Sequence, residues 1–226
     1  MSDSKHRPEN GPNESGVQDR LLRGAEQLFC ERGFKETSVR DIAAAADCNV
    51  ASINYYFGGK EKLYVAMWHR YFKILRETRL GSIEHVMSSD VRPELEELLR
   101  SYAHSFIGPL VEGGHSCRFM NLMAREMIDP HLPRDMFLEE MAVPVMTALS
   151  QALQRICPWL GQSHVHLVIL SIVGQLMHAV LAKEMFEQSE RYDVPNLDLG
   201  EIVDHVVQFS AAGIRACAVP TEEKAR

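Results

Sequence analysis

The sequence lacks cysteines in pairs. Its five cysteines are widely spaced, no two of them form a C-x-x-C motif, and their odd number leaves one without a partner. A disulfide framework and a zinc finger both need cysteines at paired spacings. The pattern therefore favours free thiols in a reducing compartment.

The sequence also lacks the short motifs of common enzyme classes. It holds ten histidines but no H-E-x-x-H, no pair of E-x-x-H motifs, no G-x-S-x-G and no phosphate-binding G-x-x-x-x-G-K-S/T. His164 and His166 are two residues apart, so on one helix they point to different faces. We predict no catalytic residue, no metal site and no cofactor.

No apolar signal segment stands at the N-terminus, where the residues are MSDSKHRPENGPNESG. The most apolar run, residues 167–182, is short for a membrane span and contains Ser171, Gln175 and His178. We expect this run to be a buried helix of a cytoplasmic protein with no membrane partner.

An excess of basic residues, common in nucleic-acid-binding proteins, is missing as well. The net charge is −7, but residues 1–80 hold 13 Lys and Arg against 11 Asp and Glu, whereas the remaining chain holds 11 against 20. Binding to phosphate depends on the charges that touch it, not on the total charge of the protein. A mildly basic N-terminal part on an acidic body therefore permits DNA binding.

Residues 38–60, SVRDIAAAADCNVASINYYFGGK, have the pattern of a helix-turn-helix. Ser38 is a good N-cap for a short helix in which Val39, Ile42 and Ala43 form one apolar face. Two helices that cross at a steep angle approach closely, and the small Ala43 suits that contact.

The turn and the second helix follow directly. Asp47 falls where the turn needs a positive φ, which Asp tolerates better than most side chains. Asn49 can cap the second helix, and the two glycines after residue 57 can end it. Small polar and aromatic groups on this helix suit base edges and phosphates, so we predict that it enters the DNA major groove.

Residues 21–63 contain A-E-x-L-F-x-x-x-G-F-x-x-T-S-V-R-x-I-A-x-x-A followed by S-I-N-Y-Y-F-G-G-K-E-x-L. This joint pattern resembles the DNA-binding domain of the TetR (tetracycline-repressor-like) family of one-component transcription regulators. Asp47 and Cys48 depart from it, since the family more often has Gly and Val there. The resemblance implies an all-helical homodimer, a palindromic double-stranded DNA operator and a small-molecule pocket in a divergent C-terminal domain. A helix-turn-helix regulator with so plain an N-terminus is expected to be bacterial.

We therefore predict an all-α fold with an N-terminal three-helix DNA-binding domain and a larger C-terminal helical domain. The expected boundaries are a disordered arm at 1–16, the helix-turn-helix domain at 17–62, the ligand-binding and dimerisation domain at 63–218, and a flexible tail at 219–226. Helices are expected at residues 17–32, 60–87, 93–112, 120–127, 134–156, 162–188 and 198–218. Pro144 should kink the helix that contains it.

By position in the resemblance, the residues expected to contact DNA are Thr37, Arg40, Val50, Ala51, Ser52, Asn54, Tyr55, Tyr56 and Lys60. Asn can read adenine and Arg can read guanine through two hydrogen bonds, so Arg40, Ser52 and Asn54 are candidates for base edges. The candidates for phosphate are Thr37, Tyr55, Tyr56 and Lys60. For Tyr56, a place in the core of the three-helix domain is the alternative.

A small-molecule effector is expected among methionine, aromatic and histidine side chains of the C-terminal domain: His104, Phe106, Met120, Met123, Met127, Phe137, Met141 and His178. Thioethers adapt to irregular apolar shapes, but they also fill ordinary cores.

The last two helices are apolar on more than one face and so need a second partner surface. They resemble the family's dimer element, a four-helix bundle with two helices from each subunit. The expected interface residues are Val165, Ile169, Ile172, Leu176, Ile202, Val206, Phe209 and Gly213. The alternative is that these helices form only the core of a monomer.

The predicted function is that of a homodimeric repressor that a small molecule releases from a palindromic operator. One alternative is a DNA-binding regulator without such a ligand, controlled by a protein partner or by oxidation of Cys48. A helical-bundle enzyme is the other.

Overall fold

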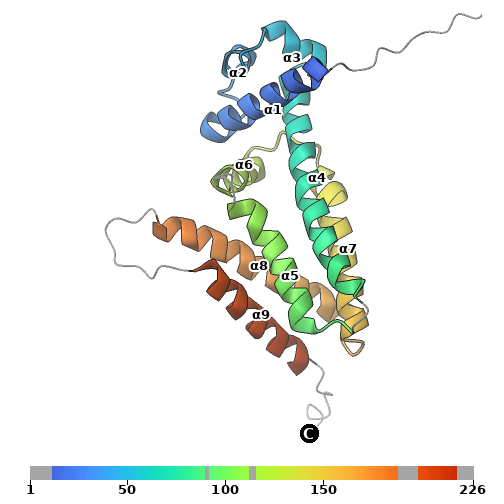
Figure 1. The fold of residues 1–226 in the computed structure, drawn as a ribbon. Coiled ribbons are helices and arrows are strands. Elements are labelled where there is room, and N and C mark those ends of the chain that lie inside the picture. The colour runs from blue at the N-terminus through green and yellow to red at the C-terminus, as the bar shows by residue number, and fades with distance from the viewer. Residues whose placement is uncertain (1–11, 90–91, 112–115, 188–197, 218–226) are drawn as a thin grey trace, which may run out of the picture. The chain divides into compact units, whose positions relative to one another are not determined.

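A computed structural model of the protein describes residues 12–89, 92–111, 116–187 and 198–217. Every regular element in these ranges is helical (Figure 1), which confirms the all-α prediction. The α-helices are α1 (Pro12–Arg32), α2 (Val39–Ala45), α3 (Val50–Phe57), α4 (Lys60–Met87), α5 (Leu95–Val111), α6 (Ser116–Ile128), α7 (Val143–Ile156), α8 (Gln162–Glu187) and α9 (Leu199–Ala216).

The chain forms two compact units, and the first of them is discontinuous in sequence. Unit 1 consists of residues up to 71 together with residues 118–133, and unit 2 consists of residues 72–117 and the chain from 134 onward. Helix α4 therefore begins in unit 1 and ends in unit 2. The single boundary expected after residue 62 differs from this division, because residues 118–133 make their contacts within unit 1.

Unit 1 is built around α1, α2, α3 and the first part of α4. Its centre is made of side chains with no exposed surface, among them Leu21, Phe29, Ile42 and Ile53. Helix α1 begins at Pro12, so residues 12–16 are helical instead of part of the expected arm. Proline is well tolerated in the first turn of a helix. Residues 1–11 of that arm, and the expected tail at 219–226, lie outside the described residues.

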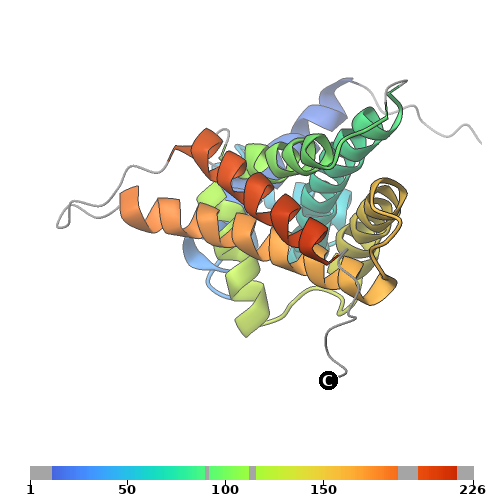
Figure 2. The ribbon, with the colours of Figure 1, turned by 90° about the horizontal axis from the view of Figure 1, so that it is seen from below.

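Unit 2 contains α5, α7, α8 and α9, of which α5 and α8 each pack against α9 (Figures 1 and 2). Pro144 does not kink the interior of a helix as predicted, because α7 begins next to it. A π-helical turn, η2 (Leu138–Ala142), precedes α7, and Pro144 stands in the first turn of α7. A first-turn residue needs no N–H donor within the helix, so the proline does not interrupt α7.

Helix α8 is apolar around most of its circumference. Val165, Ile169, Ile172 and Leu176 face the core of unit 2, and further leucines on the same helix are exposed. By length and composition, Gln162–Lys183 could cross a membrane, but a core helix of a globular protein passes the same test. The contacts of α8 with α7, α9 and α5 place it in a packed helical layer.

Candidate nucleic-acid interface

Helix α2 begins with a reciprocal pair of hydrogen bonds, in agreement with Ser38 as the predicted N-cap. The Ser38 hydroxyl accepts from the Asp41 N–H at 3.2 Å, and the Asp41 carboxylate accepts from the Ser38 N–H at 3.1 Å. The hydrogen bonds from Ser38 lower the pKa of Asp41. This capping box fixes the start of the helix, and its Ser-x-x-Asp signal is readable in the sequence.

The turn between α2 and α3 has the backbone that the sequence predicts. Asp47 has a φ of 49°, and it is the one non-glycine residue with a positive φ in the described part of the chain. The Cys48 N–H donates to the Ala43 carbonyl at 2.9 Å and closes the turn. Ala43 is buried where the two helices meet. The departure from glycine at position 47 therefore leaves the turn intact.

Replacing Asp47 by alanine is expected to leave the protein less stable than replacing it by glycine, by about 1–2 kcal/mol, because a Cβ disfavours the left-handed conformation. Chemical unfolding of the two variants measures the difference. Equal stabilities would mean that the turn relaxes to a negative φ.

Helix α3 presents most of the predicted DNA-reading residues at the surface. The Asn49 side chain accepts from the Ala51 N–H at 2.9 Å at its start, and Gly58, with a φ of 76°, ends it. Ile53 points inward and anchors the helix. The exposed predicted residues of α2 and α3 are Arg40, Val50, Ala51, Asn54 and Tyr55, whereas Ser52 and Tyr56 are half-buried.

Two of the predicted phosphate contacts have internal roles. The Thr37 side chain is 1% exposed, and its hydroxyl lies within hydrogen-bonding distance of the Gly33 and Leu28 carbonyls. Its hydroxyl is thus buried and engaged inside unit 1, so the Thr37 side chain is not free to contact a phosphate as predicted. Lys60 donates to the Phe34 and Thr37 carbonyls at 3.0 and 3.1 Å. Its ammonium therefore joins α4 to the loop after α1, a role that no local signal in the sequence indicates.

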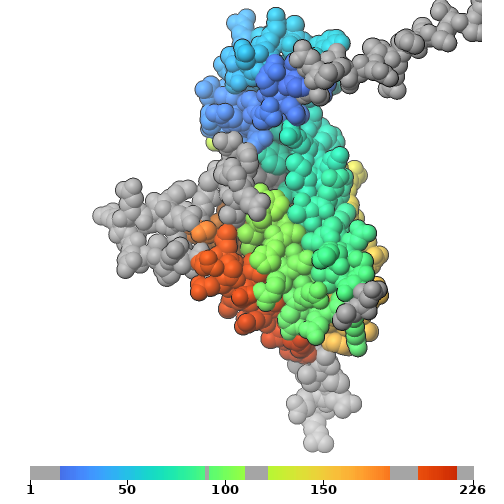
Figure 3. All heavy atoms as spheres, viewed as in Figure 1, coloured from blue at the N-terminus to red at the C-terminus, as the bar shows by residue number. Residues whose placement is uncertain are grey.

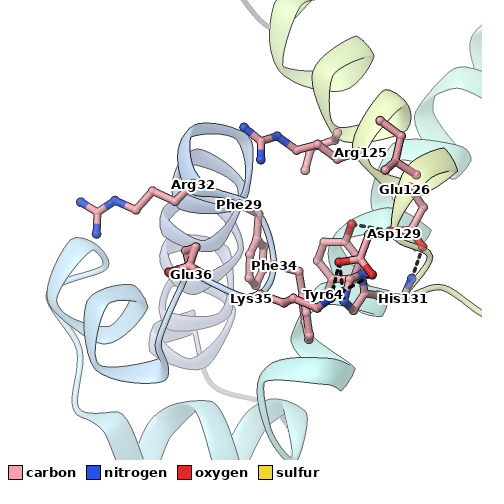
Figure 4. Close-up of a pocket in the computed structure, with 13 residues that line it drawn as sticks. Phe29, Arg32, Phe34, Lys35, Glu36, Tyr64, Arg125, Glu126, Asp129 and His131 are labelled. Carbon is pink, nitrogen blue, oxygen red and sulfur yellow. Dashed lines mark hydrogen bonds and ion pairs between the residues drawn. The ribbon is translucent and has the colours of Figure 1, made fainter.

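Residues 118–133 bring a buried carboxylate into unit 1 (Figure 4). Glu126 accepts from the Tyr64 hydroxyl at 2.7 Å and from the N–H groups of His131 and Leu132. Burial raises the pKa of Tyr64 above its ordinary value, and the hydrogen bond to Glu126 raises it further. The loop after α1 also takes part, since Lys35 pairs with Asp129 at 2.8 Å.

A pocket of about 350 Å³ lies between these groups, and its lining includes Phe29, Phe34, Tyr64 and His131. The rings of Phe34 and His131 are 4.4 Å apart between centroids. No local signal in the sequence indicates this cluster, because it joins residues more than 60 positions apart, such as Tyr64 and Glu126.

Replacing Glu126 by alanine is expected to lower the free energy of unfolding by about 2–4 kcal/mol, because the Tyr64 hydroxyl and two N–H groups lose their acceptor in a buried site. Glutamine at this position keeps one oxygen acceptor and should cost clearly less. Urea unfolding monitored by circular dichroism tests both variants. If alanine and glutamine cost the same, the hydrogen bonds are not what holds the segment.

Two family models match the chain. The model described as "Bacterial regulatory proteins, tetR family" matches residues 21–67, which include α2 and α3. The model described as "HTH-type transcriptional dual regulator CecR, C-terminal domain" matches residues 95–214, more than half of the chain. The chain belongs to the TetR family. It is thus a transcriptional regulator with a DNA-binding helix-turn-helix.

Curated relatives agree with this assignment. The chain is 33% identical over 92 residues to the "Probable HTH-type transcriptional regulator YttP" of Bacillus subtilis, a match that covers 39% of this chain and 44% of the relative. It is 25% identical over 173 residues to the dual regulator CecR of Shigella flexneri, covering 73% of this chain and 75% of that one. The chain spans about half the length of the first two curated relatives that it matches.

Solved structures share the fold. A TetR family transcription regulator from Marinobacter aquaeolei VT8 aligns with a TM-score of 0.64 at 18% identity, over 88% of this chain and 95% of that one. A TetR-like transcriptional regulator from Rhodococcus sp. RHA1 aligns with a TM-score of 0.61 at 18% identity, over 88% and 96%.

The effector residues expected in this TetR-family chain do not gather at one described pocket. Met123 and Met127 belong to unit 1, where Met127 is 82% exposed, and His104 is exposed on α5. His178 lines a groove between α8 and α9. The Met120 side chain lies outside the described residues. The other predicted effector residues, Phe106, Phe137 and Met141, are buried or half-buried in unit 2.

The expected dimer residues of this TetR-family chain divide into two groups. Val165, Ile169, Ile172, Leu176 and Val206 are buried within unit 2, which corrects their assignment to an interface. Their stripe packs inside the subunit because it faces the neighbouring helices. Ile202 is half-buried, and Phe209 and Gly213 are exposed.

Proposed function

We propose that this TetR-family regulator is a cytoplasmic repressor that binds a palindromic operator as a homodimer and is released by a small molecule. The observation that carries the homodimer is an apolar surface on α8 and α9, which we call the α8–α9 face. It comprises Leu167, Leu170 and Phe209, which are 62%, 67% and 65% exposed. Large apolar side chains grouped on two adjacent helices are typical of an interface.

The shape of the α8–α9 face supports a helical partner. A groove of about 880 Å³ runs between the two helices, lined by Gly174, His178, Phe209 and their neighbours. A Cβ added at Gly174 or Gly213 would meet nothing within 4 Å, so a second backbone can come close at both positions. Two such helix pairs form a four-helix bundle with twofold symmetry.

A palindromic operator follows from that symmetry. Each subunit would place one α3 in a major groove, and the two copies would read half-sites about 34 Å apart. Arg40 and Asn54 are exposed side chains of the types that read guanine and adenine. The tight binding of DNA would then depend on both subunits being engaged together.

Release by a ligand has a covalent route through the chain. The polypeptide passes between the units within α4 after residue 71, and again at 117/118 and 133/134. Inside unit 1, the hydrogen bond from Tyr64 to Glu126 ties α4 to the segment 118–133. We infer that an effector in unit 2 favours a position of these segments that separates the two α3 helices wrongly for the operator.

Selection of bound sequences from a random DNA pool, at moderate salt, tests the proposal. We expect enrichment of an inverted repeat and a sedimenting mass of two chains per duplex. A reporter gene downstream of the selected sequence should be expressed less when the protein is present. Enrichment of no sequence over random DNA, or of a single half-site bound by one chain, would contradict it.

A further inference from the structure

Among the described residues of unit 2, Arg79 is the one buried cationic side chain. It lies on α4 and is 3% exposed. Arginine is rarely buried to this degree unless a carboxylate or another acceptor pairs with it. Burial lowers the pKa of Arg79, as expected for a charge removed from water.

The contacts of Arg79 satisfy only part of its guanidinium. The guanidinium carbon Cζ lies 4.1 Å from the centre of the Phe106 ring, and Nη1 lies 3.2 Å from the Met141 sulfur. A thioether is a weak acceptor. On the other edge of the planar group, Nε is buried and has no hydrogen-bond partner in the part of the chain that the structure describes.

No carboxylate among the described residues compensates this charge. Among the described residues, the titratable group that acts on the Arg79 charge is the Tyr102 hydroxyl, which is itself buried on α5, and burial raises the pKa of Tyr102. Nearby serines do not help, because Ser82 lies within hydrogen-bonding distance of the Arg79 backbone carbonyl and of Ser105, not of the guanidinium. A buried cation without a counter-ion destabilises a folded protein. A bound anion would compensate the charge of Arg79.

The Nε and Nη2 edge is the side of an arginine that suits a planar anion. A carboxylate accepts two parallel hydrogen bonds from such an edge. Phe106 and Met141, both among the effector residues predicted from the sequence, would pack against the apolar body of the same molecule. The Phe137 ring, another predicted effector residue, lies 5.6 Å from the ring of Phe72 on α4.

We propose that the effector is an anionic amphipathic molecule, a carboxylic acid with an apolar body, whose carboxylate pairs with Arg79. The inference rests on the proposed ligand-responsive function and names the chemistry of that site. It makes Arg79 the residue that selects acids over neutral molecules of the same shape.

Thermal unfolding of the full-length dimer with matched probes tests the inference. The probes are benzoate, 3-phenylpropionate, hexanoate and octanoate, each compared with its primary amide. We expect at least one acid to raise the Tm of the unsubstituted protein, on the order of 5–10 °C at a hundredfold excess over its Kd, and its amide to have little effect. Arg79→Met should weaken binding of that acid by at least roughly 30-fold.

Three further variants control the test. Arg79→Gln removes the charge and keeps a polar side chain, so it serves if methionine prevents folding. Arg79→Lys keeps the charge without the planar edge and should bind the acid with intermediate affinity. Arg76→Met removes a charge one turn away, whose Nη1 donates to the Glu140 carbonyl, and should leave the preference for acids unchanged.

The outcomes separate this inference from the proposed function. Stabilisation by acids and amides alike, in both the unsubstituted protein and Arg79→Met, would overturn the inference and leave a ligand-responsive regulator. Stabilisation by no probe would also overturn it. Gel shifts of the unsubstituted protein on the selected operator judge the DNA-binding proposal independently.

Discussion

Replacing Asn54 by alanine is expected to weaken binding to the selected operator by roughly 30-fold or more. A bidentate contact to a base contributes about 1–3 kcal/mol, and a dimer would carry two copies of it. Asn54 is exposed on α3, so the substitution should leave the Tm within a few degrees of the original. Gel-shift titration with the selected palindrome measures the loss.

A second DNA and a second variant separate base reading from general phosphate contact. Asn54→Ala should tolerate changes at one position of each half-site that the unsubstituted protein rejects. Tyr55→Phe, which removes only a hydroxyl from an exposed ring, should weaken binding evenly across DNA sequences. If Asn54→Ala binds the palindrome as tightly as the original, α3 does not read bases through this residue.

Replacing Phe209 by glutamate is expected to convert the dimer into monomers. The charge would lie in the middle of the proposed four-helix interface, where no water is available to solvate it. Because both subunits must be held together to engage both half-sites, operator affinity should fall by roughly 100-fold or more. Sedimentation velocity gives the mass, and gel shifts give the affinity.

Two leucines provide the matched comparison. Leu170→Glu on the α8–α9 face should have the same effect as Phe209→Glu. Leu138→Glu introduces the same charge at a leucine on η2 that is exposed outside this face, and it should leave the dimer intact. A dimer that survives Phe209→Glu and Leu170→Glu would place the subunit contact on another surface.

The helix-turn-helix formed by α2 and α3 was predictable from the sequence because the residues that cap its helices and form its turn are close together in the chain. Ser38, Asp47 and Asn49 act on backbone groups within three residues of themselves, so cap and turn chemistry determines the module without knowledge of the rest of the fold. The roles of Thr37 and Lys60 were not predictable in this way. Their positions in the family pattern predict contacts with DNA phosphates. Their hydrogen-bond partners inside the protein depend instead on how α1 and α4 pack.

Periodicity alone could not say which apolar side of α8 lies inside the subunit. Its helical spacing predicts an interface at Val165, Ile169 and Ile172, but these residues lie in the core, and Leu167 and Leu170 form the exposed side. Both stripes have helical spacing, and only the position of the neighbouring helices distinguishes them. The burial of Arg79 was not predictable from the sequence either, because an arginine in a helical segment is expected at the surface.

The discontinuity of unit 1 has a consequence for building hybrid regulators. A hybrid that takes residues up to 62 from one parent and the rest from another would divide unit 1 between the two parents. Lys35 and Phe34 of one parent would then face the positions of Asp129 and His131 in the other. The transplantable piece is instead residues 12–71 together with 118–133. Two insertions from one parent, not a single crossover, would preserve the contacts that orient the reading helix.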